Sequence, residues 1–214
     1  MELSSTERTR LRRLREQGRS SRTALFDVLR AGFVCHLGLV LDGTPMVVPT
    51  VYGFDDSFLY FHGSVASRSL AGGQTVCVTV THVDGLVLAR SVFEHGVNYR
   101  SAMVYGLPRA LSGADKLAGL RVLSEHAAPG QWDYARRPNK KELAATSIFA
   151  LSLEEASVKV AEGPPGDGDG PDAALGLWAG VIPMEMVRRA PEPDPALPGD
   201  IAVPAHITAL TTSD

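Results

Sequence analysis

Short runs of β-branched and aromatic residues, broken by Gly, Pro and Asp, are the feature that most constrains how this chain folds. Two such runs, 33–41 and 44–54, are joined by Asp42-Gly43, a dipeptide that suits the positive φ angles of a tight hairpin turn. Further strands are predicted at 57–63, 74–83, 85–92 and 101–111, with a second hairpin turn at Asp84-Gly85. Because so many short strands must close or stack their sheet to remove exposed edges, the pattern predicts a small β-barrel.

Helices are expected on either side of these strands. The apolar residues of 23–32 and of 112–128 recur at near-helical spacing. The predicted fold class is therefore mainly β with flanking helices. We expect a basic N-terminal arm at 1–22, a single domain at 23–183 and a Pro-rich C-terminal tail at 184–214.

Charge argues against nucleic acid as a partner. The 214 residues carry a formal net charge of -3, whereas phosphate binding of that kind needs clustered positive charge. The segment 7–22 is the exception, because it is strongly basic. It fits either a solvated arm or helix, or a segment that docks on a partner or contacts an anion.

Membrane and metal partners are not expected either. No apolar stretch approaches the ~20 residues that span a bilayer, and the polar, basic start has no apolar core of a signal peptide. We therefore expect a cytoplasmic protein. Cys35 and Cys77 lie in apolar strand-like runs, where a free cysteine behaves as a small buried hydrophobe, and neither belongs to a metal-binding motif.

The stretch FHGSVASRSL, residues 61–70, follows a predicted strand and is the first candidate site. After His62, Gly63 allows a tight turn, and Ser64, Ser67 and Arg68 follow where a short helix is expected to begin. Hydroxyls, free backbone N–H groups and a guanidinium at a helix N-terminus favour a bound anion, most naturally a phosphate monoester. A capped helix with a surface arginine is the alternative.

The stretch FEHGVNYRSAMVYG, 93–106, is the second candidate. Side chains suited to a planar heterocycle gather there, namely His95, Asn98, Tyr99, Arg100 and Ser101. Asn and Arg can hydrogen-bond ring carbonyls and nitrogens, and Tyr can stack or donate through its hydroxyl. A solvated loop is the alternative explanation.

The stretch VVPTVYG, 47–53, is the third candidate, because Pro49 interrupts a predicted strand. Proline is expected only at a sheet edge or a bulge. The strand ladder is therefore expected to open there, and a ligand could approach the backbone of Pro49 and Thr50.

Taken in order, these three stretches resemble the pyridoxamine 5′-phosphate oxidase-related flavin-nucleotide-binding proteins, whose relatives include the nitroimidazole-resistance reductases. The resemblance runs from about Arg19 to Pro204 and includes KKELAAT, VKVAEGPP and LWAGVIP. It implies an FMN-binding split β-barrel that pairs as a homodimer, with the cofactor between the subunits. FMN is expected rather than FAD, because no second glycine-rich loop is available for an adenylate.

The resemblance also implies a role for each candidate residue. The phosphate of FMN would be bound by Ser64, Ser67 and Arg68, with His62 and Gly63 close to the flavin. The other cofactor contacts that it implies are Pro49, Thr50, Asn98, Tyr99, Arg100, Ser101, Lys159 and, from the partner subunit, Trp178. Where relatives carry Ser-Met and an arginine, this chain has Gly96-Val97 and Ala161, which changes the expected substrate pocket.

The function that this resemblance favours is an FMN-dependent oxidoreductase acting on a small planar or nitro-aromatic compound. FMN would carry the hydride or electron chemistry through its N5 edge, so no metal or catalytic triad is required. His62, and after it His95, are the candidate catalytic side chains, since an imidazole near neutrality can donate a proton or a hydrogen bond. A reduced nicotinamide is the expected electron donor, and it would bind transiently because the chain has no GxGxxG fingerprint.

Two alternatives remain open at this point. One is a flavin- or haem-binding protein without turnover, acting in storage, sensing or tetrapyrrole handling. The other is true pyridoxamine-phosphate oxidase activity, which fits less well because the resemblance is stronger to the related subgroup than to the authentic oxidases.

Overall fold

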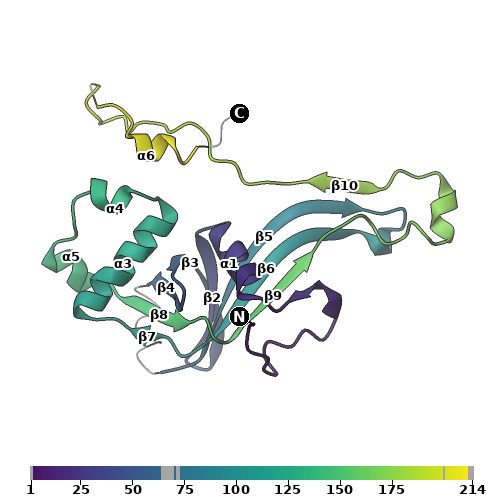
Figure 1. Ribbon diagram of the computed structural model, residues 1–214, viewed down its shortest axis with the longest axis horizontal. Coiled ribbons are helices and arrows are strands. Elements are labelled where there is room, and N and C mark those ends of the chain that lie inside the picture. The colour runs from purple at the N-terminus through teal and green to yellow at the C-terminus, as the bar shows by residue number, and fades with distance from the viewer. Residues whose placement is uncertain (1, 64–69, 71–72, 200, 212–214) are drawn as a thin grey trace.

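The computed structural model describes residues 2–63, 70, 73–199 and 201–211. Figure 1 shows an antiparallel sheet that curls into a half-barrel, with short helices at its margins. The strands are β1 (Gly18–Arg19), β2 (Val34–Leu41), β3 (Thr44–Phe54), β4 (Phe58–His62), β5 (Val76–Leu88), β6 (Gly96–Gly106), β7 (Arg109–Ala110), β8 (Ile148–Ser152), β9 (Ala156–Ala161) and β10 (Gly180–Pro183). The helices are α1 (Arg22–Arg30), α3 (Gly113–Ala127), α4 (Gln131–Tyr134), α5 (Lys140–Ala145) and α6 (Ala205–Thr208), and short 3-10 turns occupy Arg15–Gln17, Val92–Glu94 and Pro171–Leu175.

The strands form one sheet in the order β1-β9-β6-β5-β2-β3-β4-β8-β7, and β10 pairs with β5 off this path. Neighbouring strands in this order are all antiparallel. The predicted mainly β fold with flanking helices is therefore confirmed.

The hairpin β2–β3 forms as its turn dipeptide predicts. Asp42 and Gly43 have φ angles of 49° and 78°, which are the left-handed values that a tight two-residue turn requires. The two strands pair without a break from Val34↔Val51 to Leu41↔Thr44. Asp and Gly tolerate this conformation, so the turn fixes the register of the whole hairpin.

The second predicted hairpin is wrong. Instead of turning at Asp84-Gly85, the chain continues through a single strand, β5. The register between β5 and β6 shifts between Val83 and Gly85, so Asp84 is the extra residue of a β-bulge. Gly85 is needed because β10 packs there, where a Cβ would lie 2.9 Å from Val181 Cγ1. Tertiary contacts therefore override the local turn signal.

The inner face of the sheet is closed by α1. Leu25 and Leu29 of this helix are fully buried in the main hydrophobic core. The hydroxyl of Tyr52 on β3 donates a hydrogen bond of 2.7 Å to the carbonyl oxygen of Leu29, which satisfies a polar group inside the core. The alternating burial along β2 and β5 places every second side chain on this inner face.

The outer face of the sheet is covered only in part. Helix α3 lies over β3, β4 and β8, with Leu123 and Ile148 in a second small cluster. It approaches so closely that a Cβ at Gly53 would lie 2.7 Å from the carbonyl oxygen of Val122. Over β2, β5, β6, β9 and the start of β3, many outer side chains remain exposed or half-buried, and we call this region the open face.

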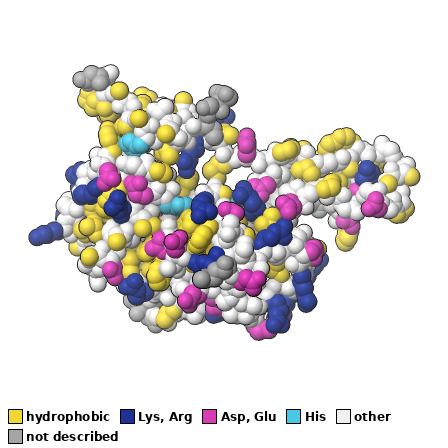
Figure 2. All heavy atoms as spheres, viewed as in Figure 1, with side chains coloured by type: hydrophobic (Ala, Val, Ile, Leu, Met, Phe, Trp, Pro, Cys, Tyr) yellow, Lys and Arg dark blue, Asp and Glu magenta, His cyan; other side chains and the backbone are white. Residues whose placement is uncertain are grey.

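The long hairpin of β5 and β6 projects from the half-barrel together with β10, as Figure 1 shows, and we call this projection the arm. Figure 2 shows hydrophobic side chains along it. Near its tip Phe93 is 90% exposed and Val92 is 83% exposed, and Trp178 before β10 is 68% exposed. Exposed apolar side chains in such number are typical of interaction surfaces, so the arm is a candidate for one.

Candidate functional site

The open face carries a pocket of about 230 Å³ across β5, β6 and β9. Thr81, Ser101 and Lys159 form one row of register partners at its centre. Because partners in a sheet share a face, these side chains point into the same space. The pocket is lined by Leu11, Thr79, Thr81, Tyr99, Ser101, Met103, Ser157 and Lys159.

Three of the predicted cofactor residues meet in this pocket, namely Tyr99, Ser101 and Lys159. The Lys159 ammonium lies 5.8 Å from the centroid of the Tyr99 ring, within the range of a cation–π interaction. Hydroxyls, a phenol and an ammonium together can donate to the carbonyls or phosphates of a bound nucleotide. The side chains of the pocket therefore suit a polar, electron-rich ligand.

The other two residues of the predicted Asn-Tyr-Arg-Ser cluster lie on the opposite face, because the four residues belong to β6 and not to a loop. Arg100 donates two hydrogen bonds of 2.8 Å to the carboxylate of Asp84, the bulge residue. The hydrogen bond to this carboxylate raises the pKa of the guanidinium above its usual value. The side-chain amide of Asn98 donates to the carbonyl oxygen of Gly163 at 3.0 Å.

Pro49, Thr50 and His62 lie on the neighbouring strands β3 and β4. β3 pairs with β4 only through Tyr52–Phe54, so the ladder on that side is open at Pro49, as the proline predicts. The Thr50 hydroxyl donates a hydrogen bond of 2.9 Å to the carbonyl oxygen of His62. This bond ties the end of β4 to β3 at the point where the first candidate stretch begins.

The remaining predicted residues are spread more widely. The predicted phosphate ligands Ser64, Ser67 and Arg68 lie outside the described residues, while Gly63 immediately follows β4. His95 lies on the arm, where its Nδ1 accepts a hydrogen bond of 3.0 Å from the backbone N–H of Ala89. Trp178 also lies on the arm and does not fill its own subunit's core.

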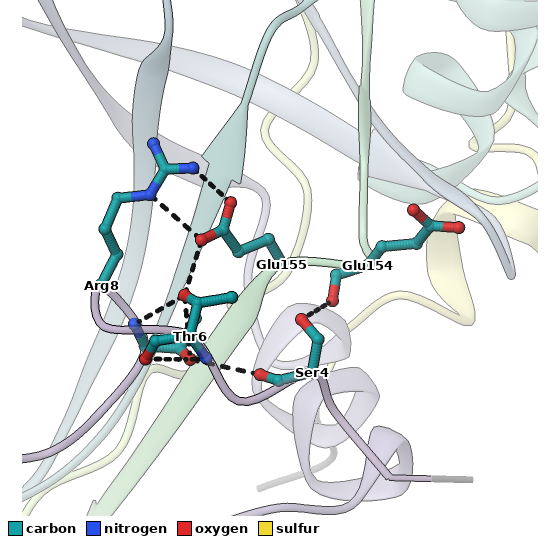
Figure 3. Close-up of polar contacts among 6 residues, drawn as sticks. Ser4, Thr6, Arg8, Glu154 and Glu155 are labelled. Carbon is teal, nitrogen blue, oxygen red and sulfur yellow. Dashed lines mark hydrogen bonds and ion pairs between the residues drawn. The ribbon is translucent and has the colours of Figure 1, made fainter.

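The N-terminal segment forms one wall of the pocket through Leu11. Figure 3 shows how this segment is held: the Arg8 guanidinium and the Thr6 hydroxyl both donate to the carboxylate of Glu155, and Ser4 donates to the carbonyl oxygen of Glu154. The hydrogen bonds from Thr6 and Arg8 lower the pKa of the Glu155 carboxyl, and the bond from Thr6 has the largest effect. β1 then pairs with β9 at Gly18↔Lys159 and Arg19↔Val158, so two residues of the basic segment form an edge strand of the sheet.

Five lining residues were not singled out from the sequence, and they are Leu11, Thr79, Thr81, Met103 and Ser157. A usable signal existed for two of them. Thr79 and Thr81 alternate with the buried Val78 and Val80, a pattern of one solvated and one buried sheet face. Leu11 and Ser157 had no such signal, because only the folded chain brings them to the pocket.

No group of three or more His, Cys, Asp or Glu side chains that could hold a metal ion occurs in the described part of the chain. Cys35 is buried and Cys77 is half-buried, and both are free thiols. Burial raises the pKa of the Cys35 thiol to about 12, so it stays protonated.

Among the helices that the structure describes, none is both long enough and apolar enough to cross a membrane.

Comparison with known proteins identifies the family. The sequence profile of the pyridoxamine 5′-phosphate oxidase family matches residues 21–160. A flavocytochrome, Anf3 from Azotobacter vinelandii, shares 36% identity over 97% of this chain and 98% of its own, with a TM-score of 0.90. An FAD- and haem-binding protein from Mycobacterium smegmatis shares 35% identity over 91% of this chain and 97% of its own, with a TM-score of 0.87.

A third solved structure agrees in fold alone. It is described as a 5-nitroimidazole antibiotic resistance protein from Bacteroides thetaiotaomicron, and it shares 18% identity over 67% of this chain and 86% of its own, with a TM-score of 0.57. No curated protein matches the chain. The chain belongs to the pyridoxamine 5′-phosphate oxidase family, and its curled sheet is the flavin-binding split barrel of that family.

Proposed function

We propose that this chain is a redox protein that binds both a flavin nucleotide and haem on the open face. The observation that carries the proposal is the near full-length similarity, at 35–36% identity, to a flavocytochrome and to an FAD- and haem-binding protein. Coverage above nine-tenths of each chain extends beyond the barrel itself to the arm and the C-terminal segment. The proposal is therefore closer to the alternative of a flavin- or haem-binding protein than to an oxidoreductase with FMN alone, and it goes beyond both because it includes the two groups together.

The residues present fit a flavin. Ser101, Thr81 and Lys159 offer two hydroxyls and one ammonium to a group that carries carbonyl and phosphate oxygens. Tyr99 adds an aromatic side chain on the same face. Ser64, Ser67 and Arg68 remain the predicted phosphate ligands, outside the described residues.

The open face also fits haem, a large apolar disc that needs an apolar surface and a ligand for its iron. Val34 and Val47 point from β2 and β3 to this face and are 45% and 66% exposed. The flavin supplies two-electron chemistry and haem one-electron chemistry when they are bound. The protein's own part is to hold both groups on one sheet and to exclude water from between them.

Titration of the cofactor-free protein with FMN and with FAD tests the flavin half of this proposal. Lys159→Ala should weaken binding at least about tenfold, as loss of a charge-assisted hydrogen bond does. Lys140→Ala, a lysine on α5 outside the pocket, should leave the affinity unchanged. Equal affinity of the wild type and Lys159→Ala would show that the pocket is not the flavin site. Preference for FMN or for FAD tests the expectation of FMN, since the relative from Mycobacterium smegmatis binds FAD.

Turnover of a small planar or nitro-aromatic compound, with a reduced nicotinamide as donor, is the finer part of the proposal. Met103 and Tyr99 line the pocket, and Met103 is 39% exposed, so a flat substrate could reach the pocket from solvent. Oxidation of reduced nicotinamide by the flavin-loaded protein, with and without a nitro-aromatic acceptor, tests it. Acceptor-dependent oxidation is expected, and its absence would leave a binding protein. His62 and His95 remain the candidate catalytic side chains.

We also propose a homodimer with the site at its interface. The open face provides one wall of a site, whereas most small-molecule sites enclose their ligand, often between subunits. The arm offers the exposed apolar side chains that a second copy would bury, among them Phe93 and Trp178. Trp178 of one subunit would then complete the site of the other.

A further inference from the structure

The haem half of the proposed function requires an axial ligand for the iron, and imidazole is the usual one. A histidine serves only if one ring nitrogen has a free lone pair in open space. His95 accepts at Nδ1, so its neutral ring carries the proton on Nε2 and has no lone pair left. His206 donates from Nε2 to the side-chain oxygen of Gln131 at 3.0 Å, and its ring lies against Gly130 and 5.2 Å from the ring of Tyr134, which leaves no room for a large planar group.

Two further histidines, His82 and His126, are hydrogen-bonded to backbone carbonyl oxygens next to the core. His82 donates from Nε2 to the carbonyl oxygen of Val28 at 2.9 Å, and its ring lies against Gly32, where a Cβ would be 2.5 Å away. His126 donates from Nε2 to the carbonyl oxygen of Gly32 at 2.8 Å, between the rings of Tyr52 and Phe54. Neither ring has room for a large planar group.

Among the described residues, His36 and His62 are the two histidines whose rings form no hydrogen bond, ion pair or ring stacking contact. His62 ends β4 beside the stretch predicted to bind the flavin phosphate. His36 lies in the middle of β2, exposed on the open face, with Pro49 and Thr79 as its register partners. Proline and threonine on either side are small, so the imidazole stands free of its neighbours.

The surroundings of His36 suit a porphyrin. Val34 precedes it on the same face of β2, and Val47 lies two residues from its partner Pro49 on β3. Both valines are exposed, so they offer an apolar surface beside the imidazole. Thr79, the other partner, lines the pocket that holds Tyr99 and Lys159. His36 on β2 and the pocket that begins on the neighbouring strand β5 therefore lie side by side on one face of the sheet.

From these observations we propose that His36 is the axial ligand of the haem iron. This assignment rests on the proposed function, which supplies the haem. It adds the residue that fixes where on the sheet the haem binds, and it separates this role from the flavin-side role expected for His62.

The experiment uses the full chain, reconstituted with haemin, in four forms: wild type, His36→Gly, His62→Gly and His206→Gly. Haem per chain and the visible spectrum report ligation, while bound flavin and far-UV circular dichroism report whether the fold survives. We expect His36→Gly to lose at least about nine-tenths of the bound haem and to keep its flavin. Added imidazole should restore the wild-type spectrum in His36→Gly alone, because it replaces the missing ring.

Two results would overturn the assignment while leaving the proposed function intact. One is wild-type haem content and spectrum in His36→Gly, and the other is imidazole rescue of His62→Gly or His206→Gly but not of His36→Gly. A wild type that binds flavin and no haem would overturn both the assignment and the haem half of the proposed function. A His36→Gly protein that loses its circular dichroism is replaced by His36→Gln, for which the same haem loss is expected and wild-type haem content would again overturn the assignment.

Discussion

At the scale of single residues, the two faces of β6 separate structural from ligand-facing groups. Arg100 uses its guanidinium on Asp84, so it stabilises the bulge of β5. Its neighbours Tyr99 and Ser101 point the other way, into the pocket. Adjacent residues in a strand always divide in this manner, so a cluster in sequence becomes two half-clusters in space.

His126 provides a prediction about pH at the same scale. Burial lowers the pKa of its imidazole below the ordinary 6.5, so the unfolded chain binds a proton here more readily than the folded one. The stability contributed by the neutral ring is therefore complete above pH 6.5 and is lost as the pH falls below that value. Thermal unfolding of wild type and His126→Gln between pH 8 and pH 5 should show a stability difference that shrinks toward acid. A difference independent of pH would contradict this explanation.

Some features of single residues could be predicted from the sequence, and others could not. Asp42-Gly43 and Asp84-Gly85 are the same dipeptide, yet the first makes a turn and the second makes a bulge. The difference comes from β10, nearly a hundred residues later, which packs on Gly85 and cannot be read locally. Most strands, α3 and the choice of Tyr99 and Ser101 as ligand-facing residues could be predicted from the pattern and the resemblance. The position of Leu11 at the pocket could not be predicted, because it depends on the hydrogen bonds that Thr6 and Arg8 donate to Glu155.

At the scale of elements, the contact between α3 and β3 decides how much of the outer face stays open. Gly53 lets the helix backbone approach, since a Cβ there would lie 2.9 Å from Leu123 Cα. Gly53→Ala should therefore displace α3 and cost about 1–3 kcal/mol of unfolding free energy, as overpacking does. Denaturant unfolding measures this, with Gly168→Ala as the control, because a Cβ at Gly168 meets open space. Equal losses in the two variants would show that the helix contact is not limiting.

At the scale of the whole molecule, the proposed homodimer would bring the arm of one copy to the open face of the other. Trp178→Ala and Arg68→Ala chains should each bind flavin poorly. If the proposed dimer forms, a mixed heterodimer has one intact site and one doubly defective site, so about half of the wild-type binding should return. Differently tagged chains allow heterodimers to be purified and their bound flavin to be counted. Heterodimers that bind no more flavin than either parent would place Trp178 and Arg68 in unrelated roles.

The central proposal for this protein is that one molecule holds two different redox groups. The visible spectrum of the full chain, purified after expression with haem and flavin in supply, tests this claim most directly, with each cofactor then extracted and counted per chain. We expect a haem Soret band together with flavin absorbance, and close to one of each cofactor per chain. A protein that carries flavin without haem, haem without flavin, or neither after reconstitution with both would contradict it.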